Sequence, residues 1–180
     1  MNLSPVSLKS TSIETPLGSM RAAGNEQGLW LLDFQDTAKG EDPESRQWGE
    51  NEIRLTQGKC TYFPQLIDEL EEYFGGTRKE FSLPLVMSGT EFQNRVWQAL
   101  LAIPYGETRT YKQQAKALGA LSAIRAVAHA NGQNRLAILV PCHRVIGANG
   151  SLTGYGGGLW RKQFLLELEK SIQPELGWSK

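Results

Sequence analysis

Two capping-box sequences constrain the second half of this 180-residue chain. A threonine followed three positions later by a glutamine marks a helix start, because the two side chains satisfy backbone groups reciprocally. The pattern occurs at Thr90–Gln93 and again at Thr110–Gln113. The second of these helices is expected to end at Gly119, and Ser122 is the expected N-cap of a third helix over residues 123–131. Two short helices around a tight turn predict a helix-turn-helix.

A cysteine lies between an apolar run and a glycine-rich segment. Ala137–Val140 consists of four apolar residues, which predicts a buried strand, and Cys142 follows closely. Residues 147–158 predict a loop that needs unusual backbone angles. This loop lacks the sequence of a phosphate-binding P-loop, which argues against nucleotide binding. A final helix is expected from about residue 159 to 170, with Phe164 facing the core.

The first half has the pattern of a small α+β unit. Residues 13–34 predict short strands separated by turns that contain glycine. Residues 36–52 are polar and weakly patterned, so we expect a loop with at most a short helix. Pro64 suits the first turn of a helix that continues to Phe74, and residues 81–86 predict an extended segment.

Composition restricts the environment of the chain. The chain has two cysteines, Cys60 and Cys142, which excludes a scaffold stapled by several disulfides and favours a reducing compartment. Only His129 and His143 could complete a zinc site with them, and the four lack ligand-like spacing, so we expect no metal. No apolar run approaches the ~18–20 residues of a membrane span, and the N-terminus lacks the apolar core of a secretory signal. We expect a cytoplasmic or otherwise intracellular protein.

We divide the chain into two domains, residues 1–87 and 88–180, and these differ in charge. The first carries 8 basic and 14 acidic side chains, whereas the second carries 11 and 5. The formal net charge of zero therefore hides a basic half behind an acidic one. Such an asymmetry favours contact between the second half and a polyanion.

Cys142 has neighbours that favour reactivity. His143 follows it directly and can take a proton, and Arg144 raises the local electrostatic potential. Both effects favour the thiolate, which is the nucleophilic form of cysteine. Cysteine proteases also pair cysteine with histidine, but their histidine usually lies far away in the sequence, so this adjacency supports a protease only weakly.

The sequence around Cys142 resembles a known family. Pro141-Cys142-His143-Arg144-Val145 reproduces the active-site motif of the O6-alkylguanine-DNA alkyltransferases, also called methylated-DNA–protein-cysteine methyltransferases. The resemblance is strong over about residues 88–170 and thin over residues 1–87. Matching positions lie on both sides of the cysteine: Phe92, Val96, Trp97, Ile103, Pro104, Gly106, Tyr111, Arg125, Ala126, Val127, Asn134, Tyr155, Gly156, Gly157, Gly158, Lys162, Leu165, Leu166 and Glu169.

The resemblance implies a fold and a reaction. The fold would be α+β, with a small RNase-H-like N-terminal domain followed by a winged-helix DNA-binding catalytic domain. The reaction would be DNA repair by direct reversal, in which a thiolate takes an alkyl group from O6 of guanine and keeps it. Each molecule would then act once, without a cofactor.

The resemblance also assigns roles to individual residues. Cys142 would be the nucleophile, His143 its base through a bound water, and Glu169 the carboxylate that orients His143, which is the logic of a catalytic triad. Asn134 would brace the site by hydrogen bonding. Tyr111 would hydrogen-bond the base ring as negative charge develops on it.

Further matched residues would form the pocket for the damaged base. The carbonyls of Cys142 and Val145 would accept hydrogen bonds from the guanine amino group, and the amide of Gly156 would contact O6. Tyr155 lies in the same glycine-rich segment. Lys162 would help order the site, although a solvated helix lysine is an alternative interpretation.

The expected partner is double-stranded DNA that contains alkylated bases. The target base must leave the stack to reach a buried thiol, and Arg125 would fill the space that it vacates. Ala126 is small enough to let the helix approach the sugar edges in the minor groove. His129 departs from the small residue that the family commonly has at this position. We expect a monomer with no obligate protein partner.

Three alternatives remain open from the sequence. A non-catalytic sensor of alkylated DNA would share the fold but lack the cysteine, which is present here. A transcription regulator of this family would carry an additional zinc module with four cysteines. A hydrolase that uses Cys142 and a histidine would need an oxyanion site and a distant orienting histidine.

Overall fold

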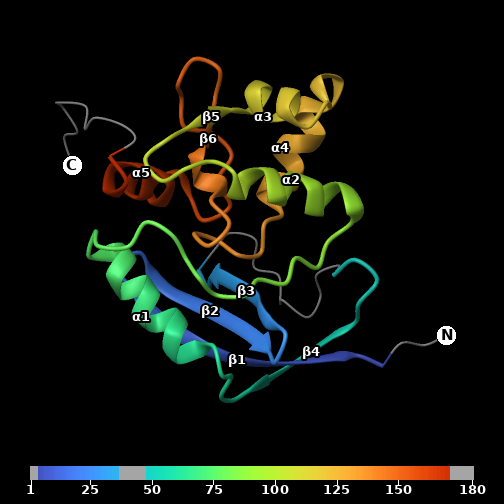
Figure 1. Cartoon of the computed structure of the whole chain (residues 1–180), viewed down its shortest axis with the longest axis vertical. Coiled ribbons are helices and arrows are strands. Elements are labelled where there is room, and N and C mark those ends of the chain that lie inside the picture. Colours follow the sequence, from blue (N-terminus) through green and yellow to red (C-terminus); the bar gives the residue numbers. More distant parts are fainter. Residues whose placement is uncertain (1–3, 37–47, 171–180) are drawn as a thin grey trace.

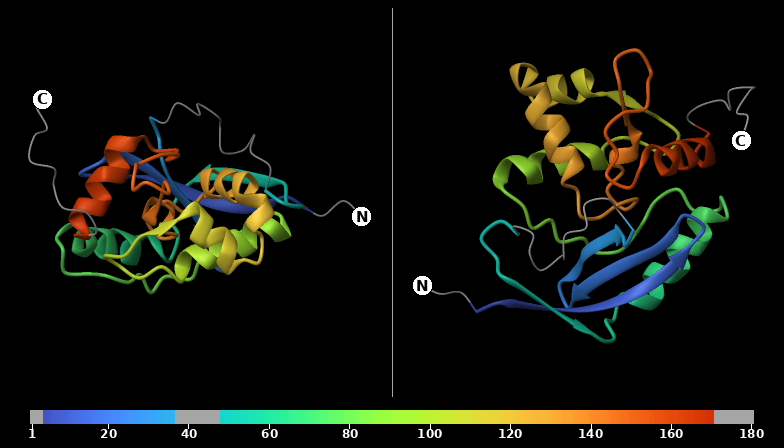
Figure 2. Two further views of the ribbon diagram at one scale, coloured as in Figure 1. Left: turned by 90° about the horizontal axis from the view of Figure 1, so that it is seen from above. Right: turned by 180° about the vertical axis from the view of Figure 1, so that it is seen from behind.

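In a computed structural model of the chain, residues 4–36 and 48–170 are described. The N-terminal half forms a sheet with one helix against it, and the C-terminal half is a group of short helices stacked beyond one edge of the sheet (Figure 1). The view from behind shows the same stacking, and in the view from above the C-terminal helices overlap the sheet (Figure 2). Within the described residues, no helix is both long and apolar enough to cross a membrane.

The N-terminal sheet has four strands in the order β3-β2-β1-β4. β1 (Val6–Thr15), β2 (Gly18–Asn25) and β3 (Gly28–Phe34) are antiparallel neighbours joined by short turns, as the sequence predicted. β4 (Ile53–Gln57) pairs parallel to β1 and was not predicted. Most of the loop expected over residues 36–52 lies outside the described residues.

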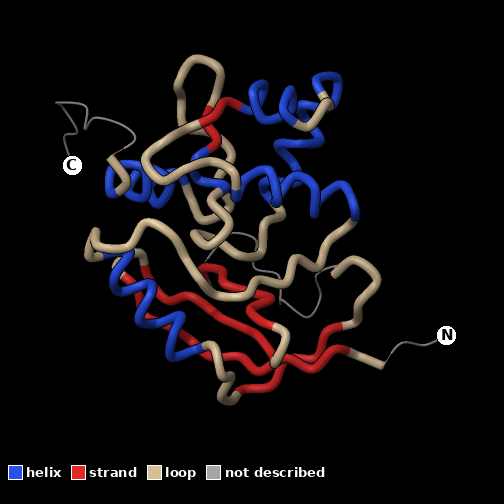
Figure 3. The backbone as a smooth tube through the Cα atoms, viewed as in Figure 1, coloured by secondary structure: helices blue, strands red, loops and turns tan. Residues whose placement is uncertain are grey.

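α1 (Phe63–Phe74) lies against the sheet (Figures 1 and 3). Pro64 occupies its first turn, where a missing N–H costs nothing, and the chain leaves the helix at Gly75. Leu66, Leu70 and Tyr73 are buried on its inner face. Residues beyond the helix run back along the sheet, and Leu85 forms a bridge to Leu29 of β3.

The C-terminal half begins with two capped helices, which confirms the capping boxes. In α2 (Glu91–Leu101) and α3 (Tyr111–Ala117), the threonine hydroxyl accepts from the glutamine N–H and the glutamine side chain accepts from the threonine N–H. Between them lies β5 (Arg109–Thr110). A single-turn helix, η2 (Leu121–Ala123), precedes α4 (Ile124–Gly132).

The predicted N-cap of α4 is wrong. Ser122 lies inside η2 and is exposed, whereas Ala123 occupies the N-cap position without a side-chain hydrogen bond. A 3₁₀ turn leads directly into the α-helix, so the first N–H groups need no serine cap. Instead, Gln114 of α3 and Asn131 of α4 exchange two buried amide hydrogen bonds of 2.9 and 2.6 Å. This pair fixes the angle of the helix-turn-helix.

The segment before the cysteine is buried but is not a strand. Ala137–Val140 forms a turn in which Ile138 has a φ of 71°, and Val140 N–H donates to Leu136 O. The apolar run correctly indicated burial, but burial alone does not decide how the backbone hydrogen bonds are made. The single-turn helix η3 (Cys142–Arg144) and β6 (Val145–Ile146) follow, and β6 pairs parallel to β5.

The last helix, α5 (Leu159–Leu168), ends just before Glu169. Leu165 and Leu166 are fully buried, whereas Phe164 is 39% exposed, so its predicted inward position is wrong. Phe164 lies on the outer face of α5, where its ring centroid is 6.5 Å from that of Phe74.

One apolar core spans both halves. Its members come from β1–β3, α1, α2, the 136–140 segment and α5. The edge strand β3 is also joined to the C-terminal half by backbone bonds, because Leu32 N–H donates to Arg135 O and Ala137 N–H donates to Leu32 O. The residues before Cys142 are therefore anchored directly on the N-terminal sheet.

Candidate active site

Cys142 opens η3 and lines a small pocket built from both halves of the chain. Its side chain is partly exposed. The pocket wall combines the end of β3, the end of α4 with the residues that follow it, and the glycine-rich loop: Asp33, Phe34, Asn131, Gly132, Asn134, Ala137, Cys142, Gly154, Tyr155, Gly156 and Gly157. A reactive sulfur thus faces a pocket rather than the packed core.

Asn134 holds the cysteine in place. Its amide Nδ2 lies 3.2 Å from Cys142 Sγ and donates to Val140 O at 2.8 Å. Its Oδ1 accepts from the N–H of Leu136 at 3.0 Å, which fixes the orientation of the amide. A donor aimed at sulfur favours the thiolate over the thiol.

His143 and Glu169 form a buried pair next to the cysteine. His143 Nε2 lies 2.8 Å from Glu169 Oε1, and neither side chain is exposed to solvent. Burial lowers the pKa of His143 despite the hydrogen bond that its ring donates to Glu169, so the ring is neutral near pH 7. Because Nε2 faces a carboxylate, it carries the proton and Nδ1 carries the lone pair. Within the described residues, Nδ1 has no hydrogen-bond partner in the protein.

Glu169 is held as a carboxylate by its neighbours. Arg144 donates from Nε to Oε2 and from Nη2 to Oε1, each at 2.9 Å. Burial alone would raise the pKa of Glu169, but the hydrogen bonds from His143 and Arg144 lower it to about 2. Tyr73 of α1 also donates to Oε1, at 2.6 Å. The predicted Glu169–His143 contact is therefore present, and Arg144 and Tyr73 extend it.

Lys162 is fully buried, so the interpretation as a solvated helix lysine is wrong. Its ammonium donates to the carbonyls of Val145 and Thr153, the latter at 2.7 Å, and so ties β6 to the glycine-rich loop. Burial lowers the pKa of Lys162 to about 8, although the nearby Cys142 favours the charged form. The Val145 carbonyl that we expected to face a guanine accepts from Lys162 in this structure.

Two tyrosines border the pocket. Tyr111, at the start of α3, donates its hydroxyl to Thr153 O at 2.9 Å, and burial raises its pKa. Tyr155 lines the pocket wall, and burial also raises its pKa well above the ordinary value. Its hydroxyl is buried and has no protein hydrogen-bond partner within the described residues. Both groups therefore keep their protons and can donate to a ligand.

The glycine-rich loop approaches its neighbours closely. Gly154 has a φ of 66° and Gly158 a φ of 95°, which confirms the expected unusual backbone angles. A Cβ at Gly157 would lie 2.8 Å from the ring of Phe34. Gly156 lies on the pocket wall.

α4 presents an exposed face beside this pocket. Arg125, Ala126 and His129 are all exposed, whereas Val127 and Ala130 are buried. The spacing of the three exposed residues puts them on one side of the helix. The next turn contributes Asn131 and Gly132 to the pocket wall, so this surface leads to Cys142.

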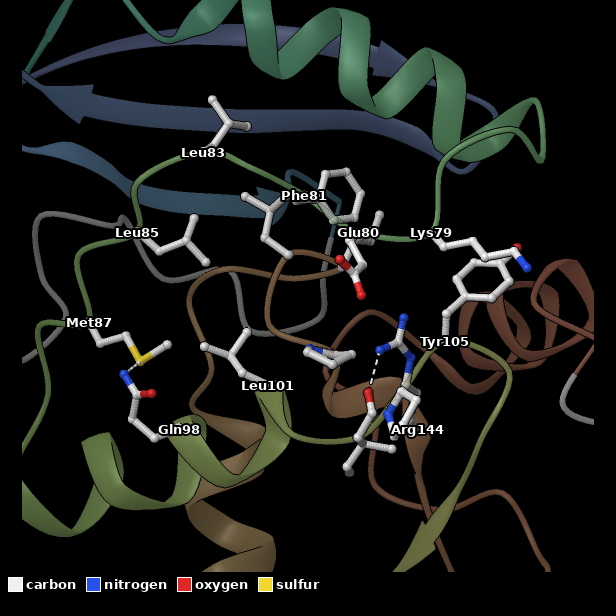
Figure 4. Close-up of a pocket in the computed structure, with 15 residues that line it drawn as sticks. Lys79, Glu80, Phe81, Leu83, Leu85, Met87, Gln98, Leu101, Tyr105 and Arg144 are labelled. Atoms are coloured by element: carbon white, nitrogen blue, oxygen red, sulfur yellow. Dashed lines mark hydrogen bonds between the residues drawn. The ribbon is translucent and has the colours of Figure 1, made fainter.

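A larger cavity lies between the two halves, and Arg144 is one of the residues that line it (Figure 4). The segment after α1 and the end of α2 line it with apolar side chains that include Leu83, Leu85 and Met87 (Figure 4). It contains no cysteine or histidine. Cys142 and Asn134 line only the smaller pocket.

The sequence analysis missed the contribution of the N-terminal half. Tyr73, Asp33 and Phe34 reach the site from α1 and β3, where the motif resemblance was thin. Arg161 was missed as well: it is 3% exposed and donates to Leu17 O and Gly157 O. Helical periodicity gave no signal for these contacts. Some join residues that are more than 90 positions apart, and in the others the partner lies on a loop.

Comparison with known proteins decides the family. The family model described as the DNA binding domain of 6-O-methylguanine DNA methyltransferase matches residues 91–171, and the one for its ribonuclease-like domain matches residues 8–87. The chain belongs to the methylated-DNA–protein-cysteine methyltransferase family. The predicted family and two-domain fold class are thereby confirmed.

Relatives of this methyltransferase family match over most of the chain. The methylated-DNA–protein-cysteine methyltransferase of Methanosarcina acetivorans is 50% identical over 159 residues, which cover 88% of this chain and 96% of the relative. That of Mycobacterium tuberculosis is 47% identical over 163 residues, 91% of this chain and 93% of the relative. The crystal structure of Mycobacterium tuberculosis OGT in complex with DNA superposes with a TM-score of 0.77 at 45% identity, covering 94% of this chain and 96% of that one.

Proposed function

We propose that this protein repairs DNA by moving an alkyl group from O6 of guanine to Cys142 Sγ. The observation that carries the proposal is the pocket in which Cys142, braced by Asn134 at 3.2 Å, lies beside a neutral His143 that is backed by Glu169. Family membership supports the same reaction. We extend the proposal to O4-alkylthymine, whose alkyl group would be transferred to Cys142 in the same way.

The thiol is activated by His143. The Cys142 proton passes through a bound water to Nδ1, the ring nitrogen that carries the lone pair. Glu169 then stabilises the imidazolium through Nε2, at 2.8 Å. Asn134 and the ammonium of Lys162 favour the negative sulfur in the same step.

Alkyl transfer follows as an in-line displacement. The thiolate forms a bond to the alkyl carbon while the bond from that carbon to O6 breaks, and the electron pair stays with guanine. The base then takes up the proton that His143 received from Cys142, so that thiol and alkylguanine become thioether and guanine and His143 is neutral again. Tyr111 donates a hydrogen bond to the base as charge develops on it, which requires its hydroxyl to release Thr153 O. No group removes the alkyl from sulfur, which makes the protein a single-turnover enzyme.

The DNA delivers the base through α4. We place the exposed face of this helix in the minor groove, with Arg125 inserted where the flipped base was and Ala126 against the sugar edges. The carbonyls of Cys142 and Val145 and the amide of Gly156 then recognise the guanine, which requires Lys162 to share or release the Val145 carbonyl. Tyr155 closes the pocket wall.

The two parts of the chain divide these tasks. Residues 1–87 support the site, and residues 88–180 bind DNA and carry the cysteine. The protein acts as a monomer on double-stranded DNA that contains alkylated bases. The alternative of a non-catalytic lesion sensor is not favoured, since such a protein has no use for an activated thiol.

The decisive experiment is the intact mass of the protein after incubation with duplex DNA that carries one O6-methylguanine. We expect a gain of one methyl group, about 14 Da, on the Cys142 peptide, and repair that stops at one lesion per protein. The Cys142→Ala variant should gain no mass but still bind the lesion. Cys60→Ala is the matched control and should react normally, because Cys60 lies before α1 and packs against the apolar core with its thiol 3.7 Å from Asn25 O. Tight lesion binding by the unaltered protein without a mass gain would instead identify a sensor.

A further inference from the structure

Tyr73 brings a side chain of the N-terminal half into contact with the residues around the cysteine. It lies near the end of α1 and has no exposed surface. Its hydroxyl donates to Glu169 Oε1 at 2.6 Å, across 96 positions of sequence. Its ring packs against Phe81 and Tyr105, with centroids 5.3 and 6.1 Å away, so the hydroxyl has a fixed position.

Glu169 Oε1 is shared among three donors. Tyr73 approaches at 2.6 Å, His143 Nε2 at 2.8 Å and Arg144 Nη2 at 2.9 Å, whereas Oε2 accepts only from Arg144 Nε among the hydrogen bonds found. The oxygen that holds His143 is thus the same one that Tyr73 contacts. A donor on that oxygen withdraws part of the negative charge that His143 would otherwise face.

Tyr73 can act only as a donor in this position. Burial, followed by the charge of Glu169, raises the pKa of its hydroxyl far above the ordinary value. Glu169 is ionised, since its pKa is about 2. The contact is therefore a hydrogen bond from a neutral phenol to a carboxylate over the whole range in which the enzyme works, and such charge-assisted bonds are strong.

We propose that Tyr73 is a positioning residue for alkyl transfer, which holds the carboxylate of Glu169 by donating to Oε1. This hydrogen bond also weakens the attraction between that carboxylate and the imidazolium of His143, so that His143 stays neutral. The inference rests on the proposed function, in which neutral His143 is the base for Cys142. It also gives the N-terminal half a direct effect on the chemistry. The domain that carries no reacting atom sets the protonation of the base.

The groups around His143 act in opposite directions on its protonation, so the loss of one hydroxyl can change that protonation. Glu169, which follows α5, favours the imidazolium, whereas burial and the cations Arg144 of η3 and Lys162 of α5 oppose it. Cys142 lies next to His143 in the chain, and its thiolate adds a further negative charge. Tyr105, in the loop after α2, contacts Arg144 through its ring, whose centroid lies 5.8 Å from the guanidinium.

The test is Tyr73→Phe, which keeps the ring and removes the hydroxyl. The single-turnover rate of methyl transfer is measured from pH 5 to 9 with saturating duplex DNA that carries O6-methylguanine. We expect the acidic limb of the profile to move up by roughly half a pH unit, because His143 binds a proton more readily without the competing donor; at a pH on that limb, the rate relative to the rate at pH 8 then falls about threefold. Tyr105→Phe is the matched control, since its hydroxyl meets Leu168 O at 3.3 Å and not Glu169.

A second measurement does not depend on alkyl transfer. The chain has only two histidines, so the imidazole NMR signals of His143 and of exposed His129 can be followed separately. We expect the pKa of His143 to rise in Tyr73→Phe while that of His129 stays constant. A folded Tyr73→Phe protein with an unchanged pH profile and an unchanged His143 titration would overturn the inference, as would a uniform loss of rate at every pH. If the unaltered protein transfers no methyl group, the proposed function fails while the His143 titration still decides the role of Tyr73.

Discussion

Glu169 is the residue on which the buried polar groups of the site converge. Its two oxygens accept from His143, Arg144 and Tyr73, and its side chain is fully buried. Removing one partner of such a network leaves the others buried without a counter-charge, which costs more than the net value of the contact. Glu169 is therefore expected to affect folding as well as chemistry.

We expect Glu169→Gln to change how stability depends on pH. The pKa of Glu169 is about 2 in the folded protein against an ordinary value of 4.5, so its contribution is complete above pH 4.5 and is lost as the pH falls through 2. The free energy of unfolding of the unaltered protein should gain about 2 kcal/mol from this residue between pH 3 and pH 7. Glu169→Gln should lack this gain.

Urea unfolding at pH 3 and pH 7 measures the difference. Glu107→Gln serves as the control, because the side chain of Glu107 is 52% exposed. An identical pH dependence in the unaltered protein and in Glu169→Gln would show that Glu169 is not held as a buried carboxylate.

At the scale of residues, the sequence indicated the residues to which we assign the reaction, but not the residue that positions them. Cys142, His143, Asn134 and Glu169 could be predicted because the motif keeps them at a characteristic spacing. Tyr73 could not, because its partner Glu169 lies 96 positions away and no local pattern relates a helix aromatic to a distant carboxylate.

At the scale of elements, α4 is the DNA-binding element in our proposal, and its exposed face can be tested directly. We expect Arg125→Ala to slow repair of O6-methylguanine in duplex DNA by at least about tenfold while reaction with the free base changes little, since only the duplex requires the vacated space to be filled. Single-turnover rates with the two substrates provide the comparison. Arg54→Ala, on exposed β4, is the matched loss of one positive charge.

Equal losses on duplex and free base would contradict a role for Arg125 in holding the base outside the stack. A similar loss in Arg54→Ala would reduce the effect to overall charge. Binding to unmodified duplex should weaken in Arg125→Ala and fall with rising salt in both variants, because phosphate contacts release counterions.

Helix starts were predictable where a side chain forms the cap, and were displaced where it does not. The capping boxes at Thr90 and Thr110 gave α2 and α3 directly, since their hydrogen bonds are local in sequence. The start of α4 follows a 3₁₀ turn, and the Gln114–Asn131 pair, which is tertiary, joins the other end of α4 to α3. Likewise, Ala137–Val140 makes a turn because its backbone bonds with β3 and with itself, a choice that apolar character does not specify.

At the scale of the whole molecule, the core and the backbone contacts of β3 make the two halves one unit. The glycine-rich loop depends on this unity through Arg161 of α5. Its guanidinium donates to Leu17 O at 2.8 Å, to Gly157 O at 2.9 Å and to both carboxylate oxygens of Asp36, at 2.7 and 2.9 Å. It also stacks 4.1 Å from the centre of the Phe34 ring, which lines the pocket. One buried cation thereby fixes the loop behind the reactive pocket to the N-terminal sheet.

We expect Arg161→Met to lower the free energy of unfolding by about 3 kcal/mol, because the carbonyls of Leu17 and Gly157 lose a charged donor while the apolar stem is kept. Methyl transfer from duplex DNA should also slow, since the loop that carries Gly156 loses its anchor. Asp36→Asn should cost less than about 1 kcal/mol, because the Asp36 side chain is 70% exposed and water screens its ion pair. Urea unfolding, monitored by both tryptophan fluorescence and circular dichroism, measures the loss in the free energy of unfolding for each variant. Comparable losses of stability in Asp36→Asn and Arg161→Met would show that the exposed ion pair links the two halves. A large loss in Arg161→Met with only a small loss in Asp36→Asn would show that the hydrogen bonds to the buried carbonyls do so.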